Sequence, residues 1–152
     1  MNDSKFIAIA LEEARLGFEE GGIPIGAVLV SSEGKILGRG RNQRVQEGVP
    51  ILHGETSALA NAGNLHHSLY KGATMYTTLS PCDMCTGACL LFGISRVVIA
   101  ENKNFVGGEA YLKQRGVEVV VLDHAECTEL MERFIRERPE LWSDDVGGKP
   151  KK

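Results

Sequence analysis

The sequence lacks the features that mark secreted and membrane proteins. Its first twenty residues (MNDSKFIAIALEEARLGFEE) have no basic start, no continuous apolar stretch and no small-residue cleavage site, so they do not fit a signal peptide. No apolar run approaches the ~18 residues of a membrane span. There are only four cysteines, three of them clustered at positions 82, 85 and 89, which is not the pattern of a disulfide framework. We therefore expect a cytoplasmic protein with no membrane partner, whose thiols bind metal or react.

An excess of basic residues is also missing. The chain carries 17 Lys and Arg against 20 Asp and Glu, a formal net charge of −3. This balance argues against the broad phosphate-binding face of a non-specific nucleic-acid binder, so we expect a small-molecule partner and no nucleic acid. The one basic cluster, KPKK at 149–152, follows two glycines. It predicts a frayed solubilising tail, with a functional arm as the alternative.

Hydrophobic periodicity predicts alternating helices and strands. Helices are expected from Asp3 or Ser4 to 21, and over 52–63, 82–93, 108–116 and 125–138; strands over 25–30, 35–42, 73–79, 96–100 and 117–123, with a polar loop at 43–50. Helices between the later strands require parallel crossovers. The expected fold is an α/β/α three-layer sandwich around a five-stranded mixed sheet. Residues 1–152 would form a single domain, with frayed ends at 1–4 and 147–152.

Two short motifs carry the chemistry: His53-Gly54-Glu55 and PCDMC at 81–85. Each opens a predicted helix, where unsatisfied amides and the helix dipole lower the pKa of a thiol and favour anions. Cys82 and Cys85 lie three residues apart on one helix face, so both sulfurs can reach one ion. His53 can supply a third ligand from the neighbouring helix start.

Cys89 tests whether such a metal site would be closed by a fourth protein ligand. It shares the face of Cys82 and Cys85, but it lies about 10 Å beyond Cys82 along the helix axis at ~1.5 Å per residue. A Zn–S bond is only about 2.3 Å long, so Cys89 is poorly placed to be a ligand. We expect Cys89, and also Cys127 on the last helix, to be small buried hydrophobic residues.

Three ligands with one open position are typical of a catalytic zinc ion, which acidifies a bound water molecule. Glu55 would then stand close to that water as a proton shuttle. Three alternatives remain: a closed structural zinc site, a CxxC redox pair, and a zinc-stabilised interaction domain without catalysis. The redox pair leaves His53 and Glu55 without a role, and the interaction domain has no use for Glu55.

HxE combined with PCxxC is the signature of zinc deaminases that act on nucleobases. The segments EEGGIPIGAVLV, LHGET, YTTLSPCDMCTGA and FIRERPELW extend the resemblance, so that about residues 5–146 are similar to the small fungal-type cytosine deaminases. The resemblance implies the cytidine deaminase-like fold, one Zn²⁺ per chain on His53, Cys82 and Cys85, and a homodimer. It also implies pyrimidine salvage, by hydrolysis of free cytosine to uracil and ammonia.

The resemblance further implies a set of substrate-binding residues: Asn42, Asp145, Phe105, Trp142, Ile25 and Ser80. On sequence alone, Asn42 could equally serve turn chemistry, because asparagine bonds its own backbone well. Trp142 could be core cover, and Asp145 would pass for part of a solvated acidic tail.

Val45 is the clearest departure from the family pattern, because the family has an aromatic residue there. A smaller side chain beside the substrate ring would enlarge the pocket. The preferred base is therefore left open among cytosine, isocytosine and 5-substituted cytosines. Guanine, or adenosine in tRNA, is the next alternative, because their deaminases share both motifs.

Overall fold

The computed structural model describes residues 2–148 and contains one five-stranded sheet. The strand order is β2 (Ile36–Arg41), β1 (Gly26–Val30), β3 (Thr74–Leu79), β4 (Arg96–Glu101), β5 (Glu118–Val121). β1 runs antiparallel to both β2 and β3, whereas β3, β4 and β5 are parallel to one another. The mixed sheet and its parallel crossovers are as the sequence predicts.

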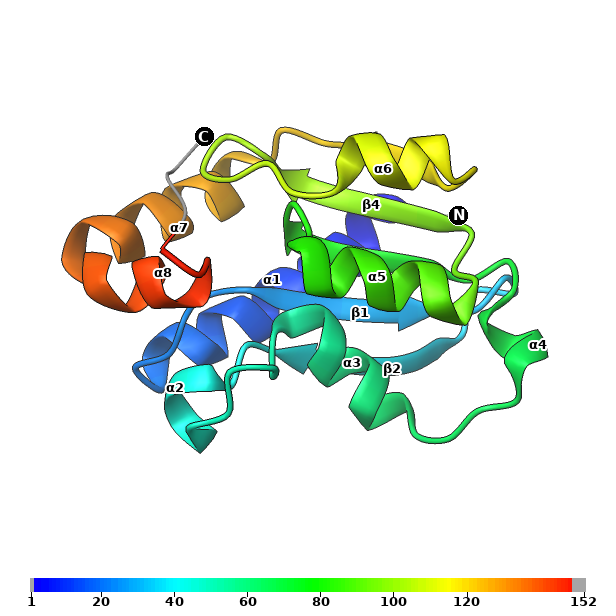
Figure 1. Cartoon of the computed structure of the whole chain (residues 1–152), viewed down its shortest axis with the longest axis horizontal. Coiled ribbons are helices and arrows are strands. Elements are labelled where there is room, and N and C mark those ends of the chain that lie inside the picture. Colours follow the sequence, from blue (N-terminus) through cyan, green and yellow to red (C-terminus); the bar gives the residue numbers. More distant parts are fainter. Residues whose placement is uncertain (1, 149–152) are drawn as a thin grey trace.

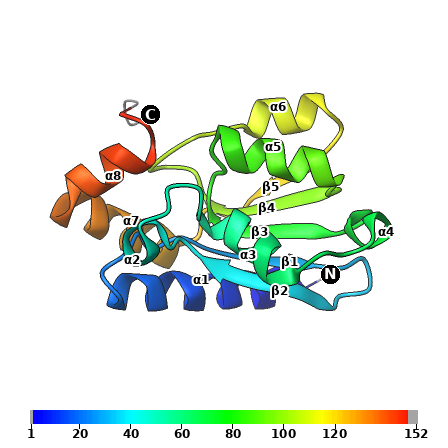
Figure 2. The ribbon, with the colours of Figure 1, turned by 60° about the horizontal axis from the view of Figure 1, so that its bottom comes forward.

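Helices cover both faces of the sheet (Figures 1 and 2). Their bounds are α1 (Asp3–Glu19), α2 (Arg44–Glu47), α3 (Gly54–Ala62), α4 (His67–Tyr70), α5 (Asp83–Phe92), α6 (Glu109–Gln114), α7 (Ala125–Glu137) and α8 (Pro139–Asp145). α1 and α7 lie on one face, and α3, α5 and α6 lie on the other. The predicted three-layer sandwich is confirmed.

The pleat of the strands divides the core into two layers, because successive side chains point to opposite faces. In β1, Val28 packs with α1, whereas its neighbour Leu29 packs beneath α3 and α5. In β4, Val98 and Val97 separate in the same way. Both strands are buried on both sides, which explains why they are apolar runs without polar alternation.

Three short helices, α2, α4 and α8, were not predicted; they lie where the sequence predicted loops or the end of a helix. α2 lies in the expected polar loop, and α4 follows α3. Pro139 does end α7, but it also begins α8, where its missing N–H costs nothing at the first helical position. Asn2 caps α1, so Asp3 and Ser4 belong to a helix and not to a frayed end. The KPKK cluster at 149–152 lies outside the described residues.

β2 carries glycines where α3 crosses it. A Cβ atom on Gly40 would come within 2.6 Å of the Ala58 amide nitrogen, and one on Gly38 within 2.5 Å of the Ala58 carbonyl oxygen. At these two glycines, the backbone of β2 therefore packs directly against the backbone of α3. This close approach fixes where α3 begins.

One edge of the sheet collects the ends of four strands. β2 and β3 end there, β1 begins there because it is antiparallel to both, and β4 ends beside β3. Segments next to this edge contain the expected site residues except Trp142 and Asp145, which lie on α8; ligand sites in open α/β sheets usually lie at such an edge. None of the described helices has the length and apolarity needed to span a membrane.

Candidate active site

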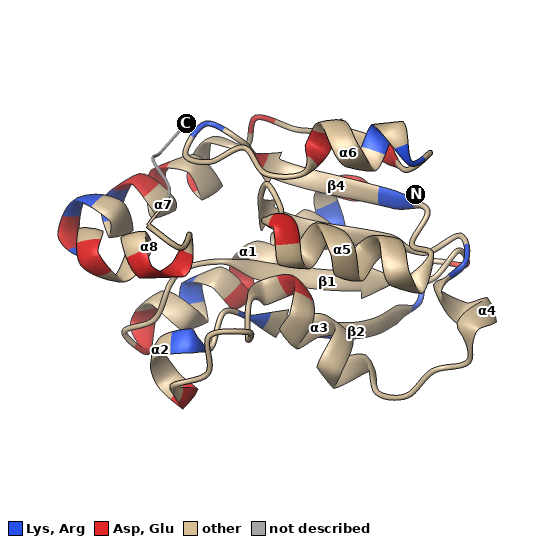
Figure 3. Ribbon diagram, viewed as in Figure 1, with Lys and Arg blue, Asp and Glu red and all other residues tan. Residues whose placement is uncertain are grey.

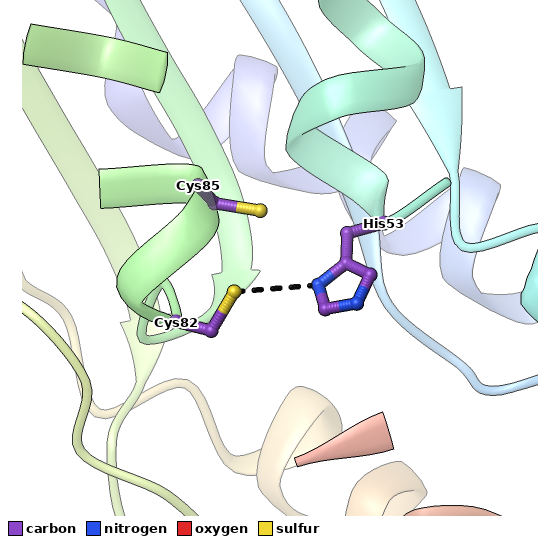
Figure 4. A group of neighbouring side chains, drawn as sticks. All are labelled: His53, Cys82 and Cys85. Carbon is purple, nitrogen blue, oxygen red and sulfur yellow. Dashed lines mark hydrogen bonds between the residues drawn. The ribbon is translucent and has the colours of Figure 1, made fainter. Parts of the chain in front are cut away.

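Two helix starts bring the three expected metal ligands together (Figure 4). His53 is the N-cap of α3 and Cys82 is the N-cap of α5, with Cys85 in the first turn of α5. Cys82 Sγ lies 3.4 Å from His53 Nδ1, and Figure 4 shows the Cys85 sulfur pointing into the same space. The donor atoms of all three residues lie within 4.8 Å of one another.

This geometry suits one tetrahedral zinc ion. Bonds of about 2.3 Å to sulfur and 2.0 Å to nitrogen place tetrahedral ligand atoms roughly 3.5 to 3.8 Å apart. The spacing of the three donors is compatible with those values after a small contraction. Cys89 is not part of the cluster; its side chain is fully buried in the core layer beneath α3 and α5. Cys127 is buried in the other layer.

The pKa values of the three donor residues indicate that the cluster favours a bound positive charge. Without a bound cation, hydrogen bonding from Cys85 and His53 lowers the pKa of Cys82 to about 4. Hydrogen bonding to Cys82 and burial raise the pKa of Cys85 well above its usual range. Burial of His53 is outweighed by the Asp145 carboxylate and by Cys82, which raise the pKa of His53 to about 10. In this state the Cys82 thiolate lies beside two protonated groups, the Cys85 thiol and the His53 imidazolium. A divalent cation bound to the three side chains would displace one proton from each of those two groups.

Glu55 is buried in the first turn of α3, two residues after His53. Burial, followed by the negative charge of Cys82, raises the pKa of Glu55 to about 7 when no cation is bound. A carboxyl group with this pKa can both accept and release a proton near neutral pH.

Asp145, on α8, is the hub of a second set of contacts. Its Oδ2 accepts a hydrogen bond from Asn42 Nδ2 at 3.3 Å, and its Oδ1 lies 3.2 Å from His53 Nε2. Arg44 Nη1 is 3.8 Å from the same Oδ1. The side chain of Asp145 is only 2% exposed, and Oδ1 accepts no well-aligned hydrogen bond from the described residues. The interpretation of Asp145 as a solvated acidic tail is therefore wrong.

Asn42 serves turn chemistry and the site together. It is fully buried, and its Oδ1 accepts a hydrogen bond from the Arg44 amide at 2.9 Å, which is the local turn bond expected of asparagine. Its Nδ2 faces Asp145. The two interpretations of Asn42 are thus compatible.

The cavities next to the ligands have an inner and an outer part. The inner pocket, about 20 Å³, is lined by all of the remaining expected residues together with Glu55 and His53: Ile25, Ser80, Phe105, Trp142 and Asp145. It opens beside a cleft of about 600 Å³. The rings of Phe105 and Trp142 meet edge to face, with centroids 6.0 Å apart. Trp142 is 6% exposed, so it both packs in the hydrophobic core and lines the inner pocket.

Val45 does not line either of these cavities. It lies on α2 and is 37% exposed, so the expectation that it enlarges the substrate pocket is not met in this arrangement. Its neighbour Arg44 does line the cleft. Sequence reasoning did not select Arg44, because an arginine in a polar loop gives no signal that it faces a carboxylate from a distant helix.

Comparison with known proteins identifies the class. The family model described as the cytidine and deoxycytidylate deaminase zinc-binding region matches residues 1–101, and the chain belongs to this family. It is therefore a zinc-dependent hydrolase of the deaminase type. The cytosine deaminase of Candida albicans is 53% identical over 146 residues, covering 96% of this chain and 97% of that protein. A tRNA-specific adenosine deaminase of Streptococcus pyogenes is 34% identical, covering 87% of this chain and 89% of its own.

Solved structures share the fold. A tRNA:A34 deaminase superposes with a TM-score of 0.72 at 27% identity, covering 84% of this chain and 99% of that one. The guanine deaminase of Nitrosomonas europaea gives a TM-score of 0.70 at 22% identity, covering 87% and 84%. The second likeness concerns the fold alone.

Proposed function

We propose that the protein hydrolyses free cytosine to uracil and ammonia, with His53, Cys82 and Cys85 as zinc ligands and Glu55 as proton carrier. The observation that carries this proposal is the 53% identity to a cytosine deaminase over 96% of the chain. The geometry agrees with it, because the donor cluster, the buried carboxyl group and an apolar pocket meet at one sheet edge.

Zinc on two thiolates and an imidazole would acidify a water molecule and so supply a nucleophile at neutral pH. The inner pocket beside Glu55 has room for about one water molecule. Glu55 takes the proton of the attacking water and passes it to ring N3, which makes C4 of the base electrophilic. The water oxygen bonds C4, and Glu55 then carries the second water proton from the new C4 hydroxyl group to the exocyclic nitrogen, so that the C–N bond breaks, ammonia leaves and the C4 carbonyl group of uracil forms.

The polar contacts that we propose for the base involve the side chains of Asn42 and Asp145. Asn42 lines neither of the two cavities, and its Nδ2 donates to Asp145, so Asn42 would serve the base by holding that carboxylate in place. Asp145 Oδ1 is buried and faces His53 Nε2 at 3.2 Å, and its second lone pair could accept a hydrogen bond from the amino group of the base. Phe105, which lines both the inner pocket and the cleft, would lie against the ring, and Trp142 would support Phe105 through their edge-to-face contact.

Deamination of adenosine in tRNA is the second candidate, because relatives at 34% identity carry that activity. The net charge of −3 counts against it. Along the ribbon in Figure 3, the positions of Lys and Arg alternate with those of Asp and Glu in the described part of the chain.

We also propose a cytoplasmic homodimer. α5 carries no charged residue after Asp83, and it presents Leu91, 78% exposed, and Phe92, 39% exposed, to solvent. We call Gly87, Leu91 and Phe92 the α5 face. A second copy of the chain would cover this apolar face, which a monomer would otherwise leave in water.

The test is ammonia release from cytosine, isocytosine, 5-methylcytosine, adenine, guanine and tRNA, with wild type and Glu55→Gln compared. We expect cytosine to be the best substrate and Glu55→Gln to lose at least about a hundredfold in kcat, the scale of general acid–base catalysis. The variant should keep one zinc per chain by metal analysis, which separates proton transfer from metal binding. Full turnover in Glu55→Gln would refute the role of Glu55. Turnover of tRNA alone would refute the free-base substrate.

A further inference from the structure

The loop between β4 and α6, residues 102–108, forms one wall of both cavities through Phe105. Phe105 makes its edge-to-face ring contact with Trp142 from this loop. The position of Phe105 therefore depends on how firmly the loop is held at each of its two ends.

A buried carboxylate holds the first part of the loop. Glu101, the last residue of β4, is fully buried, and its Oε1 accepts hydrogen bonds from the amides of Lys103 and Asn104 at 2.8 and 3.1 Å. Asn104 in turn bonds Glu101 Oε2 and the carbonyl oxygen of Thr128 on α7. This end is attached to α7 and stays on the β4 side of the site.

A second buried carboxylate, Glu109, joins the other end to the metal-ligand segment. Ser80 Oγ donates to Glu109 Oε2 at 2.6 Å and accepts from the Gly107 amide at 2.9 Å. Asn102 Nδ2 donates to both carboxylate oxygens of Glu109, each at 3.2 Å. Glu109 thus joins the first loop residue to Ser80, which lies two residues before the ligand Cys82.

The loop also packs against that segment without spare room. The Gly108 amide donates to the Pro81 carbonyl oxygen at 2.9 Å, and a Cβ atom on Gly107 would lie 1.8 Å from the same oxygen. The contact requires Ser80 to keep its place. The Ser80 amide donates to the Glu101 carbonyl oxygen at 3.1 Å, and the Ser80 hydroxyl is oriented by Glu109. The Ser80 hydroxyl and the Asn102 amide both donate to the buried carboxylate of Glu109, which therefore joins them.

From this network we propose that Glu109 is a positioning residue for the substrate pocket. Through Ser80 and Asn102 it fixes the loop so that Phe105 stands against Trp142, at a set distance from the zinc ligands. Glu109 touches neither the metal ligands nor the base. Its effect on substrate binding rests on the proposed function, but its effect on the loop does not.

The test uses Glu109→Ala, with Glu109→Gln as the conservative variant and Glu132→Gln, an exposed position on α7, as the matched control. Trp142 is the only tryptophan of the chain, so intrinsic fluorescence reports the Phe105 contact directly. We expect a red-shifted emission in Glu109→Ala, because release of Phe105 exposes the indole. KM for the base should rise on the order of tenfold, the scale of a lost charged hydrogen bond, with a smaller change in kcat. Glu109→Gln, which keeps one acceptor, should lie between wild type and Glu109→Ala.

Two outcomes would overturn the proposal. The first is a lower melting temperature in Glu109→Ala with unchanged fluorescence and unchanged KM at a temperature where the variant is folded; Glu109 would then only stabilise the fold. The second is loss of zinc, which would place its action on the metal and not on the pocket wall. If no free base is turned over by wild type, the proposed function fails, while the fluorescence shift still decides the role of Glu109.

Discussion

At the scale of residues, the cysteines of α5 divide into two kinds by what they face. Cys82 and the fully buried Cys85 face His53, whereas Cys89, equally buried, packs in the core layer against the sheet, where burial raises the pKa of its thiol. A shared helix face is therefore not sufficient for a shared metal, because the ion needs all donors within one coordination sphere.

We expect Cys89→Ala to keep one zinc per chain and full activity, while Cys82→Ala loses the metal. Removal of the buried sulfur should lower the free energy of unfolding by about 1 kcal/mol through the cavity it leaves. Metal analysis of the purified variants and chemical denaturation are the measurements. Loss of zinc from Cys89→Ala would return the site to the closed, structural class.

Other site residues show where sequence reasoning stops. The spacing of His53, Glu55, Cys82 and Cys85 is a local pattern, and so it could be recognised without a structure. Asp145 could not be placed from its own surroundings, since SDDV resembles an exposed acidic end. Its burial depends on α8 turning back toward β2, which is a tertiary contact without a local signal.

At the scale of elements, the strand and helix pattern was predictable because each core element is long or strongly apolar. The short helices were not, since a single turn has too few residues to show a period. α8 was missed for another reason. A proline that ends one helix can also begin the next, and the sequence shows only the break.

The glycine in β2 beneath α3 gives an element-scale prediction. In Gly40→Ala the added methyl group would meet backbone atoms of Ser57 and Ala58, so α3 has to move away from the sheet. We expect a loss of about 1 to 3 kcal/mol in unfolding free energy, the usual cost of overpacking, together with weaker zinc binding because His53 moves with α3. Zinc affinity from chelator competition is the measurement. Ile36→Ala, at the far end of β2, should lower stability without weakening zinc binding; an equal loss of zinc there would contradict this explanation.

A pH-dependent contact ties the start of α1 to the sheet. The Arg96 guanidinium donates to both carboxylate oxygens of Asp3 at 2.7 Å, and Tyr76 donates to the same carboxylate at 2.7 Å. The hydrogen bond from Arg96, opposed in part by burial, lowers the pKa of Asp3 below its ordinary value of 3.8. Because the pKa of Asp3 is lower in the folded state, the contact stabilises the fold fully at pH values above 3.8. This stabilisation is lost as the pH falls through the pKa of the folded state.

Asp3→Asn should therefore be less stable than wild type by about 1 kcal/mol at pH 7. The difference should begin to shrink as the pH falls below about 4, where the Asp3 carboxylate of the unfolded chain becomes protonated, and it should approach zero only as the pH falls through the lower pKa of the folded state. Urea denaturation of both proteins between pH 3 and 7 measures it, with Glu132→Gln as a control for a charge change alone. A difference that is constant across this range would show that the carboxylate charge is not involved.

At the scale of the whole molecule, the α5 face gives a prediction about assembly. Leu91→Asp should convert the proposed dimer to a monomer, which sedimentation velocity would show, and it should cost little stability in the monomer because Leu91 is 78% exposed. Leu16→Asp, on α1 across the sheet, should leave the dimer intact. A monomeric wild type would refute the dimer, and a dimer broken only by Leu16→Asp would place the interface on the other side of the sheet.

The two ends of the described chain lie far apart (Figure 1). Asp3 bonds Arg96, the first residue of β4, at the edge of the sheet opposite the site. Gly147 lines the cleft itself. An affinity tag or fused reporter attached at the amino end would be attached far from the cleft. One attached at the carboxyl end would follow Gly147, a residue of the cleft, by only a few residues. For kinetic work and for immobilisation, the amino end is therefore the safer point of attachment.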